Sequence, residues 1–109
     1  MNDIEKNATR EAIENIISSK TVDLAKETLM DFFIDVPDKN IGNVIAQEVK
    51  ELSFQTSVEY DEEDNSWTCY CSKNIFLDFN TIMNIEDSLD EIAKKHGGYS
   101  DGFGTFGNL

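Results

Sequence analysis

The stretch ETLMDFFIDVPDKNIGNVIAQEVKELSFQTSVEY, which runs from Glu27 to Tyr60, changes its hydrophobic period twice. Apolar residues recur first at every second position, then at helical spacing, and then at every second position again. The stretch therefore predicts a strand, a helix and a second strand with short connections. This order is the first half of a split βαβ unit.

The first of these strands, residues 27–36, has two unlike faces. One face is entirely apolar and consists of Met30, Phe32, Ile34 and Val36. The other face mixes apolar and acidic side chains and consists of Leu29, Asp31, Phe33 and Asp35. The alternation predicts one face against a core and one mixed face. Pro37 ends the strand, because proline cannot extend a ladder, and Asp38 is a suitable cap for the next helix.

A helix and a hairpin follow. The helix is amphipathic, and its apolar residues are Ile41, Val44, Ile45, Val49 and Leu52. Two further alternating runs, residues 54–60 and 67–72, are separated by the polar segment 61–65. Such runs with a short turn between them predict a β-hairpin.

The remaining segments complete the architecture. Residues 4–17 have helical spacing, and so do residues from Asn84 to the Gly97-Gly98 pair, which ends that helix as glycine commonly does. The apolar residues 74–83 show no period, and we expect a strand end and a packed connection there. Residues 99–106 alternate aromatic and small residues and predict a last strand.

The predicted fold is an α+β, ferredoxin-like split βαβ sandwich. Two helices cover one face of a four-stranded antiparallel sheet, and an extra helix precedes them. The length of 109 residues suits one domain. We expect that domain to span residues 1–109, with the N-terminal helix in residues 1–20 and the βαββαβ core in residues 25–106.

The chain is strongly acidic. It has 22 Asp and Glu against 9 Lys and Arg, so its formal charge is 9 − 22 = −13. A negative surface potential speeds encounters with basic partners. Nucleic-acid binding needs a basic cluster, and none here is denser than Lys94-Lys95. We therefore expect a basic protein partner and no direct contact with nucleic acid.

No membrane segment or signal peptide is expected. The longest apolar runs contain three residues, as in Phe32–Ile34, whereas a membrane span needs about 20. The N-terminal residues 1–6 show no basic segment followed by an apolar run. Neither feature therefore points to a membrane or to secretion.

The sequence offers no constellation for catalysis, a metal or a cofactor. The only histidine, His96, lies in the last turn of a predicted helix, where it complements the helix dipole or is partly buried. Cys69 and Cys71 point the same way on one strand, about 7 Å apart, a poor geometry for a disulfide. We expect free buried thiols; half of a metal site is the alternative, but further Cys or His ligands are missing.

Two polar motifs have simple structural interpretations. The acidic run Asp61-Glu62-Glu63-Asp64 lacks the ligand spacing of an EF-hand, which favours a solvated hairpin tip over a calcium site. The glycines at 97–98 and 102–104 do not lead from a strand into a helix, where phosphate-binding loops act. They are better explained by a helix end and by close packing.

The mixed face of the sheet is the candidate contact surface. It would carry Phe33 and Tyr70 together with Asp31, Asp35 and Glu59. These carboxylates would repel a phosphodiester chain, but they suit a basic peptide or an arginine-rich surface, whose guanidinium groups pair with carboxylates and stack on rings. The first helix, residues 4–17, could instead cover part of this face, and the two interpretations do not exclude each other.

The closing segment carries the most specific motif, which consists of Gly98, Tyr99, Asp101, Gly102, Phe103 and Gly104. Together with Val58-Glu59-Tyr60, Trp67 and the spacing of Leu89, Ile92 and Ala93, it resembles the RraB family of bacterial regulators that inhibit ribonuclease E. In that family tryptophan is usual where Phe103 stands, and Ser100 is an insertion. Some members continue into a long acidic tail, whereas this sequence ends at Leu109. From the sequence alone, the closing motif of residues 98–104 has either a structural or a functional role.

The resemblance implies a ferredoxin-like fold and an activity exerted through protein contact. Our hypothesis is a non-catalytic acidic protein that binds and inhibits or modulates a ribonuclease E-like endoribonuclease in the cytoplasm. The alternative is an immunity protein or antitoxin that neutralises a basic toxin. The expected partner-binding residues are Asp31, Phe33, Asp35, Glu59, Asp61, Glu62, Glu63, Asp64 and Tyr70.

Overall fold

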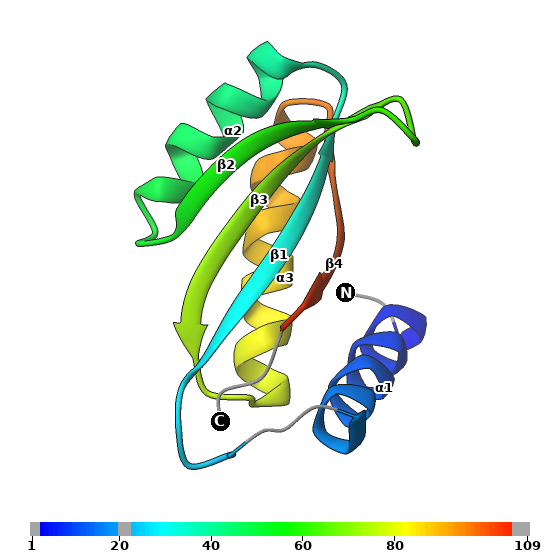
Figure 1. The fold of residues 1–109 in the computed structure, drawn as a ribbon, viewed down its shortest axis with the longest axis vertical. Coiled ribbons are helices and arrows are strands. Elements are labelled where there is room, and N and C mark those ends of the chain that lie inside the picture. The colour runs from blue at the N-terminus through cyan, green and yellow to red at the C-terminus, as the bar shows by residue number, and fades with distance from the viewer. Residues whose placement is uncertain (1–2, 20–22, 106–109) are drawn as a thin grey trace.

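The computed structural model describes residues 3–19 and 23–105, which form three helices and four strands (Figure 1). Their order along the chain is α1 (Asp3–Ser19), β1 (Thr28–Val36), α2 (Lys39–Lys50), β2 (Gln55–Asp61), β3 (Ser66–Ile75), α3 (Phe79–Lys95) and β4 (Tyr99–Gly104). The last six elements have the predicted βαββαβ order. The predicted α+β, ferredoxin-like fold is confirmed.

The four strands form one antiparallel sheet in the order β2-β3-β1-β4. Strand β1 is central, and its Phe32 pairs with Cys71 of β3 on one side and with Phe103 of β4 on the other. Helices α2 and α3 lie together on one side of this sheet (Figure 1). We call the opposite side of the sheet the open face.

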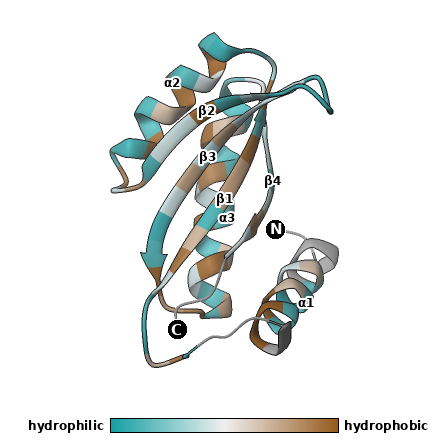
Figure 2. Cartoon of the chain, viewed as in Figure 1, coloured by the Kyte–Doolittle hydropathy of each residue, from teal (hydrophilic) through white to brown (hydrophobic). Residues whose placement is uncertain are grey.

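The core lies between the sheet and these two helices. Every second residue of β1 is buried, from Thr28 to Val36. The apolar faces of the two helices complete the core with Ile45, Val49, Ile82, Leu89 and Ala93. Figure 2 shows apolar and polar residues alternating along β1. The period-two pattern of the sequence thus sets which side chains enter the core.

Helix α1 joins the helical layer and does not cover the open face. The Thr9 hydroxyl donates to Glu86 of α3 over 2.8 Å, and the guanidinium of Arg10 lies 4.6 Å from the ring centroid of Phe79. Ile13 and Ile16 of α1 are buried in the core. The possibility that residues 4–17 shield the mixed face is therefore wrong, because the apolar stripe of α1 is used against α3.

Helix α3 begins earlier than expected. The carboxylate of Asp78 accepts hydrogen bonds from the backbone nitrogen and the hydroxyl of Thr81, both over 2.9 Å, and so caps the first turn. The prediction of a packed connection up to residue 83 and a cap at Asn84 was wrong. The apolar window 74–83 has no single period because it holds the end of β3, a short connection and the first turn of α3.

None of the helices within residues 3–19 and 23–105 has the length and apolar content that a bilayer crossing requires.

The earlier start of α3 makes Ile82 a core residue, with no exposed surface. We expect Ile82→Ala to lower the free energy of unfolding by about 2–5 kcal/mol, because it leaves a cavity between α3 and the sheet. Urea denaturation followed by circular dichroism measures this. Val44→Ala, at a side chain 45% exposed on α2, is the matched control and should change stability by about 0.5 kcal/mol or less. Equal effects would contradict the position of Ile82.

Candidate functional site

The open face brings together the predicted partner-binding residues of three strands. Phe33 of β1 lies opposite Tyr70 of β3, and Asp35 lies opposite Thr68, whose other neighbour is Glu59 of β2. Asp31 is the next residue of β1 on the same face, opposite Ser72. Residues far apart in the sequence thus form one surface, as expected from the strand alternation.

Two aromatic rings form the centre of this surface. The rings of Phe33 and Tyr70 meet edge to face, with their centroids 5.6 Å apart and an interplanar angle of 82°. Both side chains are half-buried, although no helix covers them. The pair therefore leaves part of its ring surface available on the open face.

Hydroxyl groups hold the carboxylates beside these rings. Ser72 donates to Asp31 over 2.5 Å, and the Tyr99 hydroxyl donates to Asp35 over 3.1 Å. The hydrogen bond to Asp35, together with the negative charge of that carboxylate, raises the pKa of Tyr99 above its ordinary value. Tyr99 is half exposed, at 50%, and belongs to the open face. Its contact with Asp35 follows from the β1–β4 register, which the sequence does not show.

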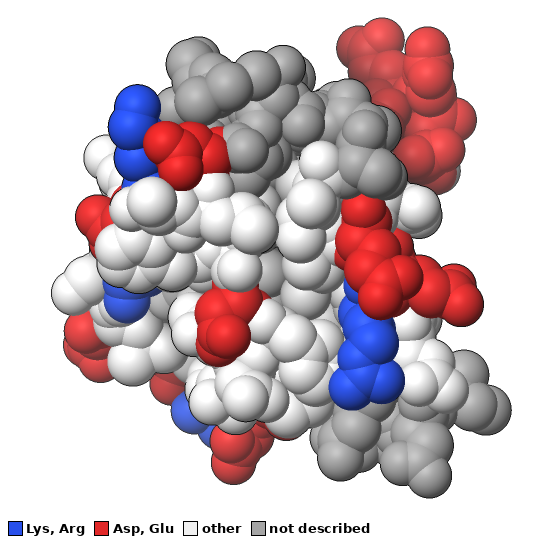
Figure 3. Space-filling model, turned by 90° about the horizontal axis from the view of Figure 1, so that it is seen from below, with Lys and Arg blue, Asp and Glu red and all other residues white. Residues whose placement is uncertain are grey.

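The acidic turn between β2 and β3 continues the edge of this surface. The Asp61 carboxylate accepts hydrogen bonds from the backbone nitrogens of Glu63, over 2.9 Å, and Asp64, over 3.4 Å, and so closes the turn. Asp61, Glu62, Glu63 and Asp64 are all exposed. In Figure 3 the largest acidic cluster projects at the upper right, on the side where Figure 1 places this turn.

The acids of the open face and of the β2–β3 turn are not neutralised by basic side chains of the described residues. None of the nine predicted partner-binding residues forms an ion pair with another residue of the described chain. Lys73, which is the only Lys or Arg in the four described strands, points to the other side, where its Nζ donates to the Leu52 carbonyl. The surface therefore presents a local excess of negative charge.

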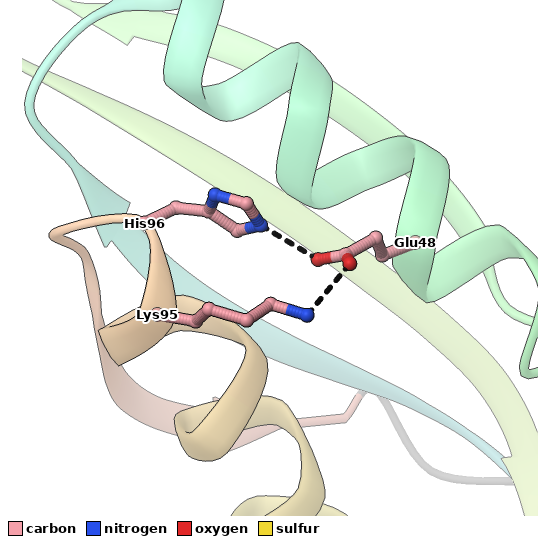
Figure 4. A network of polar contacts seen from close by, with 3 residues as sticks. All are labelled: Glu48, Lys95 and His96. Carbon is pink, nitrogen blue, oxygen red and sulfur yellow. Dashed lines mark hydrogen bonds and ion pairs between the residues drawn. The ribbon is translucent and has the colours of Figure 1, made fainter.

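On the helical side of the sheet, the carboxylate of Glu48 is paired within the fold. Glu48 of α2 contacts Lys95 over 2.7 Å and His96 over 2.8 Å, which ties α2 to the C-terminal end of α3 (Figure 4). The hydrogen bonds from Lys95 and His96 lower the pKa of Glu48. His96 is partly buried at the end of α3, and this carboxylate is a partner that the helical pattern did not show.

The two cysteines lie in the core. Cys69 and Cys71 are free and fully buried, with their sulfur atoms 3.9 Å apart. The contact with Cys69 and burial raise the pKa of the Cys71 thiol, which keeps it protonated at neutral pH. Within the described residues, no group of three or more His, Cys, Asp or Glu side chains is arranged to hold a metal ion.

The closing motif joins α3 to β4 and sets the position of β4. Gly97, with φ +87°, and Gly98 end α3, and the Gly98 nitrogen donates to the Ala93 carbonyl over 2.8 Å. The Ser100 nitrogen then donates to Asp90 over 3.0 Å. Among the motif residues, Gly98 is buried, Gly102 has φ +115° and Phe103 packs against the core. Asp101 is exposed, and Gly104 lies opposite Asp31.

A comparison with models of protein families finds a match that covers most of the chain. The sequence model described as "Regulator of ribonuclease activity B", RraB, matches residues 6–105. The chain belongs to the RraB family. The match spans nearly all of the chain and so includes the open face and the acidic turn of this RraB-family protein. A comparison with curated proteins finds no match.

The Glu48 contacts predict a pH dependence of stability. A carboxylate whose pKa is lowered by folding contributes stability above its unfolded pKa, and this contribution is lost as pH falls through the folded pKa. We expect wild type to be more stable than Glu48→Gln near pH 6, with the difference shrinking between about pH 5 and pH 3. Urea unfolding across this range tests it. Glu51→Gln, an exposed neighbour at the end of α2, should show no such trend.

A substitution of Gly98 tests how β4 is placed against β1. A Cβ atom there would lie 2.7 Å from the Asp35 carbonyl oxygen, so Gly98→Ala forces β4 away from β1. We expect a loss of about 1–3 kcal/mol in the free energy of unfolding. Gly104→Ala is the control, because its Cβ atom would be at an ordinary 3.8 Å from the Phe33 ring. A tolerated Gly98→Ala would contradict the close approach.

Proposed function

We propose that this RraB-family protein binds a ribonuclease E-like endoribonuclease in the cytoplasm and lowers its activity through protein contact, without catalysis of its own. The observation that carries the proposal is the unpaired acidic surface formed by the open face and the β2–β3 turn. The family description, regulator of ribonuclease activity, supplies the class of partner.

The physical mechanism is competition for basic groups. A ribonuclease must hold the RNA backbone, and proteins do so with Lys and Arg side chains near the phosphates. Carboxylates held on a rigid sheet can engage such groups through charge-assisted hydrogen bonds. An acidic surface also raises the rate of encounter with a basic partner. The docked protein then occupies groups that would otherwise contact RNA.

The open face resembles an RNA-binding sheet in its aromatic rings but not in its charges, and the charges favour a protein partner. Its central aromatic pair resembles the stacking platform of RNA-binding sheets, but Asp31, Asp35 and Glu59 surround it. These three carboxylates repel phosphates, because the one Lys of the described strands, Lys73, points to the other side of the sheet. The same arrangement attracts a cationic protein segment.

An immunity protein or antitoxin would use similar chemistry against a basic toxin. Charge alone does not separate the two functions. Membership in the RraB family, whose description names regulation of ribonuclease activity, favours the ribonuclease regulator.

Neutralising the open face should weaken binding to a purified ribonuclease E-like enzyme. We expect the triple variant Asp31→Asn, Asp35→Asn, Glu59→Gln to lose about tenfold in affinity and to inhibit RNA cleavage correspondingly less. Surface plasmon resonance and a cleavage assay measure the two effects. The matched control is Glu14→Gln, Glu51→Gln, Glu91→Gln, which removes the same charge from exposed positions in or next to the helices and should bind nearly as wild type does.

The salt dependence of binding to the ribonuclease is the second part of this test. Wild-type binding should weaken steeply between about 0.1 and 0.5 M salt, because the Debye length falls in this range. Binding that is indifferent to salt would refute the electrostatic mechanism. Equal losses in the two triple variants would show that net charge, and not the open face, sets the affinity.

A further inference from the structure

We propose that the open face recognises arginine and discriminates against lysine, and that its occupant is an extended, arginine-rich segment of the protein partner. This inference rests on the proposed function, because it specifies the chemistry of the same surface. It concerns five side chains of the three adjacent strands β3, β1 and β4. These are Asp31, Phe33, Asp35, Tyr70 and Tyr99.

The first observation is the alternation of acid and ring along β1. Asp31, Phe33 and Asp35 occupy successive positions on the open face, and same-face neighbours in a strand are roughly 7 Å apart. A guanidinium group stacked on the Phe33 ring is therefore within reach of a carboxylate on either side. Tyr70, edge to face with Phe33, widens the aromatic platform.

The second observation is that both carboxylates are oriented but incompletely used. One oxygen of Asp31 accepts from Ser72, and one oxygen of Asp35 accepts from Tyr99. Neither carboxylate has an ion-pair partner within the described residues, and the second oxygen of each accepts no hydrogen bond there. The hydroxyl donors restrict the rotation of the carboxylates, so less conformational entropy is lost when a cation binds.

These features favour arginine over lysine. Guanidinium is planar, stacks on aromatic rings and is more weakly hydrated than ammonium, so a half-buried ring platform desolvates it at a smaller cost. Ammonium can pair with Asp31 or Asp35 as a point charge, but it gains less from Phe33 and Tyr70. The acid–ring–acid arrangement thus adds discrimination to an attraction that both cations share.

The spacing of the carboxylates specifies an extended ligand. Asp31 and Asp35 are four residues apart in one strand, a separation of roughly 13 Å. In an extended peptide, arginines four residues apart have a similar separation. Such a segment can place one guanidinium near each carboxylate.

The test compares two synthetic peptides of equal charge, in which arginines or lysines recur every fourth residue between glycine and serine. Titrations are followed by the amide NMR signals of the full chain. We expect the arginine peptide to bind about fivefold more tightly, with the largest shifts on β1 and β3. In the double variant Phe33→Leu, Tyr70→Leu, the ratio should fall to about one while lysine-peptide binding remains. Tyr60→Leu, which removes an exposed aromatic ring beside Trp67, is the control and should keep the ratio.

The outcomes separate this inference from the proposed function. Equal, salt-sensitive binding of both peptides would overturn arginine selectivity and leave ribonuclease binding intact. Absence of peptide binding to a chain that still captures the ribonuclease would overturn the open face as the docking site. Shifts on β1 and β3 that depend on protein concentration alone would assign the face to a second copy and overturn the inference. Selective arginine binding by a chain that does not bind the ribonuclease would refute only the proposed function.

Discussion

Strand β1 pairs on both of its edges, with β3 and with β4, so each of its side chains must enter the helical layer or the open face. A slip of one residue would exchange the two sets, and would bury Asp31 and Asp35 without partners in place of Phe32 and Ile34. Burying a carboxylate without a partner is highly unfavourable. The acids of the open face therefore specify the register of the central strand as well as supplying the candidate contact surface.

Two groups of carboxylates in the described residues differ in their partners. Glu48 and Asp90 are paired with basic side chains or backbone donors and connect elements of the helical side. The carboxylates of the open face and the β2–β3 turn have only hydroxyl or backbone donors as partners. Like charges at this density repel one another in the free protein, and a cationic partner removes the repulsion. Under the proposed function, the arrangement serves association more than stability.

Most of the fold could be predicted because each element carries its own periodicity. The alternation of residues 27–36 placed Phe33, Asp31 and Asp35 on the mixed face, and the structure has them there. The position of α1 could not be predicted, since an amphipathic stripe shows that a helix packs but not against what. The start of α3 was missed because one apolar window spans two elements with different periods.

The partners of the carboxylates could not be predicted because they depend on register. Nothing in the sequence shows that Tyr99 lies opposite Asp35, or that Ser72 lies opposite Asp31. Register follows from the whole set of cross-strand contacts, including the shift between Phe32 and Ile34 in the β1–β4 pairing. Sequence reasoning therefore found the acids and the rings but not the hydroxyls that orient them.

The closing motif links the packing of β4 against β1 to the orientation of a carboxylate on the open face. Gly98 has no side chain, and a Cβ atom there would meet the Asp35 carbonyl, so this glycine allows β4 to approach β1. The next residue, Tyr99, can then reach the Asp35 carboxylate with its hydroxyl. The motif therefore has a structural role, and it also contacts the candidate contact surface. Its glycine packs the fold, and through that packing its tyrosine orients an acid of the open face.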